Sequence, residues 1–208
     1  MYNPPHFTES RPEILRRIIT THPLGILITA TAGQLDANHL PFHFDPDGGP
    51  HGTLIAHVAR ANPLWRECPG GTPVLVIFRG AEGYISPNWY PGKAESHRLV
   101  PTWNYEVVHA HGMLTVRDDP KFVRGVVARL TRTHESSQPR PWKMSDSPAE
   151  FIDQMLDNIV GIEIAITRLE GKAKLSQNRE ARDQAGAAAA LAQSGNDELA
   201  EAMRRGKL

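Results

Sequence analysis

Apolar and polar residues alternate along most of the chain with the period of β-strands. Residues 162, 164 and 166 are all isoleucine, and isoleucine at every second position is typical of a strand with one buried face. Loops rich in proline and glycine separate such segments, as at residues 45–50 and 87–101. Strands are predicted at residues 24–31, 34–44, 52–58, 73–79, 83–86, 102–117 and 159–170.

Helical spacing of apolar residues flanks the predicted strands. Helices are predicted at residues 10–22, 119–135 and 148–157, and again in the tail from residue 178, with a break near residue 195. Ser10 with Glu13, and Ser147 with Glu150, have the spacing of capping boxes. Asn178 is placed to cap the first tail helix.

The order of these elements indicates a fold that is mainly β with flanking helices. Closely spaced strands with turn signals favour a barrel, whereas a doubly wound sheet needs regular alternation of strand and helix. We expect a barrel domain with inserted helices over residues 1–177. Residues 178–208 are expected to form a C-terminal helical tail.

Composition narrows the possible functions. Lys and Arg number 23 and so do Asp and Glu, which argues against a bulk electrostatic attraction to nucleic acid or to an anionic membrane. Cys68 is the only cysteine, so no disulfide forms within the chain and a cytoplasmic location is expected. The sequence has no signal-peptide pattern and no apolar run of membrane-spanning length.

Four clusters combine flat rings with short polar side chains at strand ends or in adjacent loops. They are residues 38–42, 56–62, 85–90 and 101–105. A planar, amphipathic cofactor needs both apolar surface and hydrogen-bond donors, so these clusters are candidates for binding one. Groups suited to a phosphate accompany them, namely Arg60, Ser86, Lys93, Arg98 and Thr102. The alternative is that the rings fill a barrel core.

Other chemistries have less support. His109 and His111 share a strand face, as do His39 and His43, but no set of histidine, cysteine and carboxylate residues has a recognised metal spacing, and no metal site is predicted. Haem binding stays an alternative because of the ten histidines. Neither a glycine-rich nucleotide fingerprint, a phosphate loop nor a hydrolase nucleophile elbow is present.

Taken together, the clusters give the sequence a family likeness. It resembles the PaiB-type family, described as FMN-binding negative transcriptional regulators. The residues that carry the resemblance are Met1-Tyr2 with Pro5-His6-Phe7, and residues 39–42, 57–63, 84–90, 100–105, 159–164 and 174–179. These segments follow one another in the order of the family and span the chain from Met1 to Arg179.

The resemblance implies an FMN-binding split barrel, like that of pyridoxamine-phosphate-oxidase-like proteins, that forms a homodimer with a flavin at each subunit boundary. It places the isoalloxazine ring near Asn38, His39 and Leu40. It assigns the phosphate and ribityl groups to His57, Val58, Ala59, Arg60 and Asn62. Trp103 and Asn104 are expected near the ring, from the same or the second subunit, with Ser86 and Lys93 as further contacts.

Two classes of function remain open at this point. The resemblance implies a regulator, with DNA or a regulatory protein as its partner. The tail helices on either side of residue 195 loosely resemble a helix-turn-helix, but the first is dominated by alanine and offers few groups able to read base edges. The alternative is an FMN-dependent oxidoreductase or flavin reductase, because the same fold hosts such enzymes. No catalytic residue is assigned.

Overall fold

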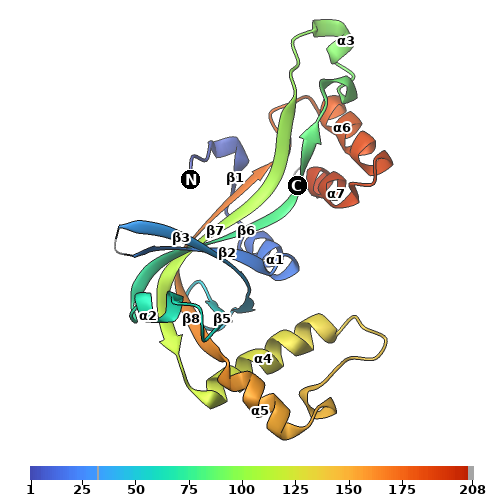
Figure 1. Cartoon of the computed structure of the whole chain (residues 1–208). Helices are drawn as coiled ribbons and strands as arrows, with labels where there is room; N and C mark the ends of the chain where they lie inside the picture. The colour runs from blue at the N-terminus through green and yellow to red at the C-terminus, as the bar shows by residue number, and fades with distance from the viewer. Residues whose placement is uncertain (32, 206–208) are drawn as a thin grey trace. The chain divides into compact units, whose positions relative to one another are not determined.

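The computed structural model describes residues 1–31 and 33–205. Its central element is an eight-stranded sheet with the order β3-β2-β6-β7-β8-β5-β4, and β1 pairs with β8 (Figure 1). The strands are β1 (Thr8–Glu9), β2 (Leu24–Thr31), β3 (Gln34–Pro41), β4 (His43–Asp45), β5 (Thr53–Ala59), β6 (Thr72–Ile85), β7 (Thr102–Arg117) and β8 (Ile159–Lys174).

Helices and short turns of 3-10 helix accompany the strands. They are η1 (Pro5–Phe7), α1 (Pro12–Thr21), α2 (Leu64–Glu67), η2 (Pro87–Trp89), α3 (Lys93–Ser96), α4 (Pro120–Glu135), η3 (Met144–Asp146), α5 (Ala149–Asp157), α6 (Ala181–Gln193) and α7 (Asp197–Arg205). None of the helices within the described residues combines the length and apolar character needed to cross a membrane.

The chain forms two compact units, and the long strands β6, β7 and β8 contribute residues to both. Unit 1 comprises Met1–Thr21, Arg79–His109 and Glu170–Leu208, of which residues 206–208 are not described. Unit 2 comprises His22–Phe78 and Ala110–Leu169.

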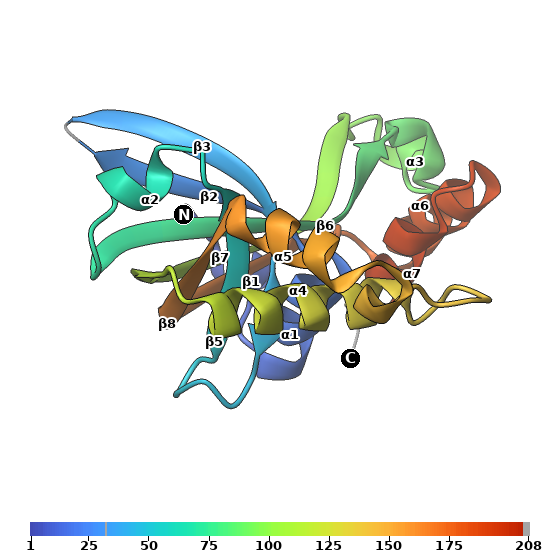
Figure 2. The same ribbon diagram turned by 60° about the horizontal axis from the view of Figure 1, so that its bottom comes forward.

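Unit 2 contains the β2–β3 hairpin and the antiparallel pairing of β5 with β8, in which Leu54 lies opposite Ile164. Helix α4 covers β5, because Val126 and Leu130 pack against Ile55. The Asp119 carboxylate accepts a hydrogen bond from the backbone N–H of Phe122 and so caps α4. Helix α5 runs beside α4 in the same unit (Figure 2).

Unit 1 closes its core with the two C-terminal helices. The apolar faces of α6 and α7, with Leu191, Leu199 and Met203, pack in one buried cluster with Ile85 and Tyr90. Figure 1 shows α6 and α7 side by side. Residues 178–205 are therefore integrated into unit 1 through this shared core.

The predicted class, mainly antiparallel β with flanking and C-terminal helices, is confirmed. The strands predicted at 73–79 and 83–86 are in fact one strand, β6. Gly80 and Gly83 do not interrupt this strand. They allow other residues to pack closely against it, since a Cβ at Gly83 would lie 2.9 Å from Nδ2 of Asn196. The segment predicted as one strand at 34–44 is instead divided into β3 and β4 at Phe42, whose N–H bonds to the carbonyl of Pro23.

Two predicted helix caps are wrong. Helix α6 starts after Glu180 rather than after Asn178, and α5 starts after Pro148, and neither preceding residue makes a side-chain capping bond. At α1, the carboxylate of Glu9 accepts from the backbone N–H of Arg11. The predicted loop at 87–101 contains η2 and α3, and the short strand β1 was not anticipated because two residues carry no readable periodicity.

Candidate functional site

Two of the segments predicted to hold the cofactor meet in unit 2. Nδ2 of Asn62, in the segment after β5, donates a hydrogen bond of 2.7 Å to Oδ1 of Asn38 on β3. Oδ1 of Asn62 accepts from the backbone N–H of Leu64 at 2.9 Å and thereby orients the first turn of α2. The fold thus joins residues 24 positions apart into one polar group.

The alternation of side chains along each strand decides which neighbouring residues are exposed and can contact a ligand. On β3, His39 is exposed and Leu40 is half-buried, and on β5, Val58 is buried and Ala59 exposed. Among the described residues, Nδ1 of the half-buried His57 is enclosed without a hydrogen-bond partner. Burial lowers the pKa of His57 below its ordinary value, so the imidazole is neutral near neutral pH.

Arg60 uses most of its hydrogen-bonding capacity within the protein. Its two terminal nitrogens bind the carboxylate of Asp118 at 2.9 and 2.7 Å, and Nε donates to the carbonyl of Asp157 at 2.7 Å. A further bond reaches the carbonyl of Ile159 at 3.2 Å. A guanidinium has five N–H donors, so about one is left for a phosphate.

One ring beside Arg60 was not predicted as part of the site. The indole Nε1 of Trp65 donates to the carbonyl of Arg60 at 3.0 Å, and the guanidinium of Arg66 lies 4.3 Å from the ring centroid. The closeness of Trp65 in sequence to the segment 56–62 was the signal that could have identified it, but the sequence indicated only that Trp65 lies in a short helical turn.

The other predicted residues belong to unit 1. The hydroxyl of Ser86 accepts from the backbone N–H of Asn88, and the ammonium of Lys93 donates to the side chain of the same asparagine. Both side chains therefore stabilise the turn around η2. The serine hydroxyl keeps its own proton and the ammonium keeps further N–H groups, which leaves both able to contact an anion.

Trp103 and Asn104 point to opposite sides of β7. Half of the Trp103 surface is exposed, whereas Asn104 is fully buried. Nδ2 of Asn104 donates to Oγ of Ser176 at 2.9 Å and also contacts Sδ of Met203 on α7. Within unit 1, Asn104 therefore has a core position beneath α7, and only Trp103 presents a surface to a ligand.

The polar segment 174–179, which carried part of the resemblance, also lies in unit 1. Nζ of Lys174 donates to the hydroxyl of Thr102 and to the carbonyl of Trp103, so it holds the start of β7. Burial is the main cause that lowers the pKa of Lys174, followed by the charges of Lys172 and Arg179. Ser176 adopts a positive φ of 63° and contacts the hydroxyl of Tyr90 at 3.3 Å.

Comparison with known proteins relates these residues to a family. Residues 1–168 match the family model described as "Putative FMN-binding domain". The Bacillus subtilis protein named protease synthase and sporulation protein PAI 2 is 30% identical over 183 residues, which cover 88% of this chain and 85% of the relative. A protein of Emericella nidulans is 32% identical over 224 residues, covering 91% of this chain and 89% of the relative.

A solved structure extends the comparison to the fold. The FAD and haem binding protein from Mycobacterium smegmatis superimposes with a TM-score of 0.59 at 16% identity, and the match covers 85% of this chain and 78% of the other. The predicted split barrel of the flavin-binding type is confirmed. FMN is the cofactor that the family description names, as predicted. The chain belongs to this FMN-binding domain family and resembles the PaiB-type regulators within it.

Proposed function

We propose that this chain is an FMN-binding regulator of gene expression, with part of the flavin site formed by Asn38–Leu40 and His57–Asn62 of unit 2. The observation that carries the proposal is the hydrogen bond between Asn62 and Asn38, because it joins two separate segments that the resemblance assigns to the flavin. The family match over residues 1–168 supplies the identity of the ligand.

The side chains of unit 2 suit a flavin chemically. A flavin presents a flat ring with carbonyl and nitrogen acceptors at its edge, together with ribityl hydroxyls and a phosphate. Nδ1 of His57 lacks a partner among the described residues, His39 is exposed, and the guanidinium of Arg60 retains an N–H. When bound, FMN supplies a redox-active ring, while the protein binds and orients it.

We extend the proposal to a homodimer in which the partner subunit supplies Trp103. A ring that is half exposed within its own unit is suited to covering a ligand held by a second copy. A twofold axis relating the copies creates two equivalent sites. A flavin also needs flat surface on both faces, which a cleft between copies offers.

Mixing two variants tests both the site and its shared construction. Asn62→Asp retains the acceptor for the N–H of Leu64 but places a negative charge near the proposed phosphate position, and Trp103→Ala removes the ring. Each variant alone is expected to bind FMN at least about tenfold more weakly in a fluorescence titration. After unfolding and refolding together, about a quarter of the sites should regain full affinity, because half of the dimers are mixed and each mixed dimer has one intact site out of two.

The result that contradicts the shared site is the absence of recovery in a mixture shown to contain mixed dimers. Unchanged FMN affinity in Trp103→Ala removes Trp103 from the site. Gln193→Ala, an exposed change on α6, is the matched control and should bind FMN normally.

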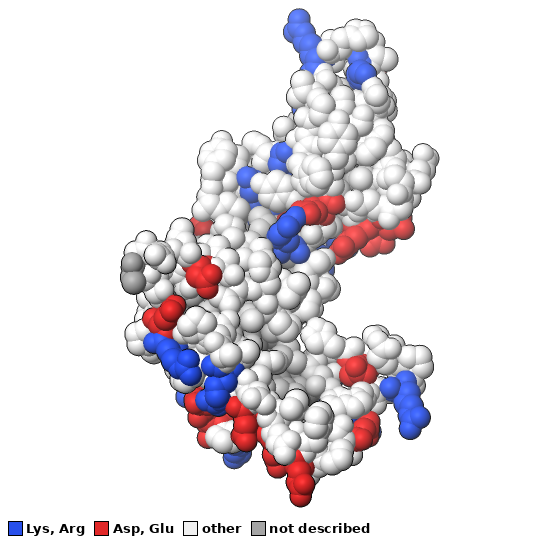
Figure 3. Space-filling model, in the orientation of Figure 1, with Lys and Arg blue, Asp and Glu red and all other residues white. Residues whose placement is uncertain are grey.

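The regulatory part of the proposal rests on the PaiB-type resemblance and on the relative named for protease synthesis and sporulation. Direct reading of DNA by the tail has little support, because Asp197, Glu198 and Glu201 are exposed on α7 and would repel phosphates. On the face drawn in Figure 3, acidic and basic side chains are interspersed. We therefore favour regulation through a protein partner. We place it in the cytoplasm, because a chain with a single cysteine forms no internal disulfide and suits a reducing compartment.

Transcript levels in cells that carry Asn62→Asp test this function. A regulator that needs FMN predicts changed levels of a limited set of transcripts. Unchanged transcripts, together with NAD(P)H consumption by the FMN-loaded protein above the free-flavin background, would instead identify an oxidoreductase. A salt-sensitive gel shift of promoter DNA by the purified protein would contradict the preference for a protein partner.

A further inference from the structure

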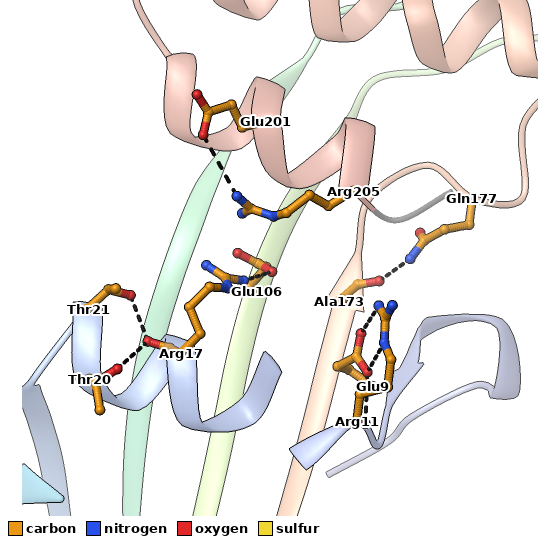
Figure 4. Close-up of polar contacts among 10 residues, drawn as sticks. All are labelled: Glu9, Arg11, Arg17, Thr20, Thr21, Glu106, Ala173, Gln177, Glu201 and Arg205. Atoms are coloured by element: carbon orange, nitrogen blue, oxygen red, sulfur yellow. Dashed lines mark hydrogen bonds and ion pairs between the residues drawn. The ribbon is translucent and has the colours of Figure 1, made fainter. Parts of the chain in front are cut away.

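A polar pocket of about 370 Å³ lies within unit 1, and none of the residues predicted to contact the flavin lines it. Its walls come from the segment around β1, from α1, from β7, from the end of β8 and from α7. The charged and polar residues that matter for its chemistry are Glu9, Arg11, Arg17, Glu106, Gln177 and Arg205. Figure 4 shows Arg17 on α1 bound to Glu106 and Arg205 on α7 paired with Glu201.

Glu106 is the most buried of these charged groups, with 3% of its side chain exposed. Nη2 of Arg17 binds its Oε1 at 2.7 Å. Gly80 on the neighbouring strand β6 has no side chain and so leaves space for Glu106. A Cβ added at Gly80 would lie 3.0 Å from Cβ and 3.5 Å from Oε2 of Glu106. The sequence therefore provides space for a buried carboxylate at this point.

Three buried polar atoms of the pocket residues have no hydrogen-bond partner within residues 1–31 and 33–205. They are Nε of Arg17, Nη2 of Arg205 and Oε2 of Glu106. Buried polar groups in native proteins are nearly always paired, since an unpaired one has lost its hydration without replacement. The set consists of two donors on cationic groups and one acceptor on an anionic group.

The charges of the pocket favour an anion. Arg11, Arg17 and Arg205 face two carboxylates, Glu9 and Glu106, which leaves one excess positive charge among the lining arginines and glutamates. Burial raises the pKa of Glu9, but its hydrogen bonds from Arg11 outweigh this effect and the pKa is lowered overall, so the carboxylate stays ionised. Glu201 lies 3.7 Å from Nη1 of Arg205 and is largely exposed, outside the pocket lining.

We propose that this pocket binds a small organic anion that carries a hydroxyl or ammonium group beside its carboxylate or phosphate. The anionic oxygens accept from Nε of Arg17 and Nη2 of Arg205, and the hydroxyl or ammonium group donates to Oε2 of Glu106. Such a ligand satisfies all three unpaired atoms at once. The volume is within the range of small-molecule sites.

This inference goes beyond FMN binding and does not depend on it. If the protein is a regulator, a ligand bound in this pocket would act as an effector of regulation in addition to the flavin. Because none of the predicted flavin contacts line the pocket, loss of one site should leave binding at the other intact.

Matched probes test the proposed ligand class by isothermal titration calorimetry. L-malate and L-aspartate are compared with succinate, which lacks the hydroxyl and the ammonium group, and glycerol 3-phosphate is compared with propyl phosphate. At least one donor-bearing probe is expected to bind with a Kd below about 1 mM and at least about tenfold more tightly than its matched probe. Absence of binding by all donor-bearing probes at about 10 mM, or equal binding by matched probes, overturns the proposal.

Two arginines on the same helix provide the matched variants. Arg205→Met removes a donor from the pocket and should weaken binding of the best probe by about tenfold. Arg204→Met changes the exposed neighbour, which does not line the pocket, and should leave the affinity unchanged. Equal affinity in the two variants, with both shown to be folded by thermal unfolding, overturns the assignment. FMN titration of Arg205→Met should match the wild type, so failure of the pocket proposal is distinguishable from failure of the flavin site.

Discussion

At the scale of single residues, His57 shows how burial changes the chemistry of a side chain. Its imidazole is half-buried on β5, and this burial favours the neutral form. His43 on β4 has the same tendency, because burial and then the charge of Arg129 lower its pKa. The two histidines therefore connect the stability of unit 2 to pH.

Stability should fall as the pH drops below about 6.5, the ordinary pKa of histidine. Below that value the unfolded chain binds protons that the folded chain does not, so acid favours unfolding. The slope for His57 is at most about 1.4 kcal/mol per pH unit. Urea unfolding from about pH 7.5 to about pH 5.5 should show a smaller loss for His57→Gln than for the wild type. His51→Gln, at an exposed loop position, is the control, and an equal loss in both variants would refute the assignment.

At the scale of elements, Asn196 both caps α7 and bonds it to the sheet. Oδ1 of Asn196 accepts from the N–H of Leu199 in the first turn of α7, and Nδ2 donates to the carbonyl of Glu82 on β6 at 3.0 Å. Gly83 allows this close approach, because a side chain there would meet both Asn196 and Leu199. The cap of α7 by Asn196 therefore requires a glycine at position 83 of the strand.

Asn196→Ala should lower the free energy of unfolding by about 1–2 kcal/mol, because it removes the cap and leaves the carbonyl of Glu82 without its partner. Chemical denaturation measures the change. Gln193→Ala, exposed at the end of α6, should change stability by less than about 0.5 kcal/mol. Equal stability of Asn196→Ala and the wild type would show that the docking of α7 depends on its apolar face alone.

Sequence patterns predicted elements better than they predicted contacts between elements. The strand predicted at 102–117 matches β7, and the helix predicted at 119–135 differs from α4 by one residue, since long periodic segments with a clear cap are strong signals. The two glycines of β6 gave the wrong prediction because glycine in a sequence signals a break as readily as a close packing contact.

The same limit applies to the sites. Asn38 and Asn62 were both candidates, but their hydrogen bond depends on how β3 and β5 are arranged, which no local pattern encodes. The pocket in unit 1 was missed because Arg17, Glu106 and Arg205 come from three elements whose local patterns indicated only packing or a charged tail. Only the resemblance, which spans residues 1–179, linked distant segments to one ligand.

At the scale of the whole molecule, the family match and the folded unit have different boundaries. The match ends at residue 168, whereas unit 1 takes its last segment from Glu170 onward. That segment supplies Leu175, Leu191 and Leu199 to the buried cluster around Tyr90. Residues outside the family match are therefore required to bury the apolar residues within it.

A chain that ends at residue 168 should expose this cluster and aggregate. Apolar surface that a missing element normally covers promotes association. Light scattering and binding of the dye ANS should both rise strongly relative to the full-length chain prepared in the same way. A truncated chain that stays monomeric and unfolds cooperatively would show that α6 and α7 are dispensable for folding.

The order in which the segments of unit 1 occur along the chain has a consequence for synthesis on the ribosome. Its first segment, Met1–Thr21, emerges early, but the unit cannot complete its core until α7 has been made. All of unit 2 precedes α6 in the chain, so every residue of unit 2 is made before α6 and α7. At that stage the apolar residues Ile85 and Tyr90 are still exposed, because α6 and α7 normally cover them. The nascent chain therefore passes through a stage with one complete and one incomplete unit, at which a chaperone that recognises exposed apolar segments would bind.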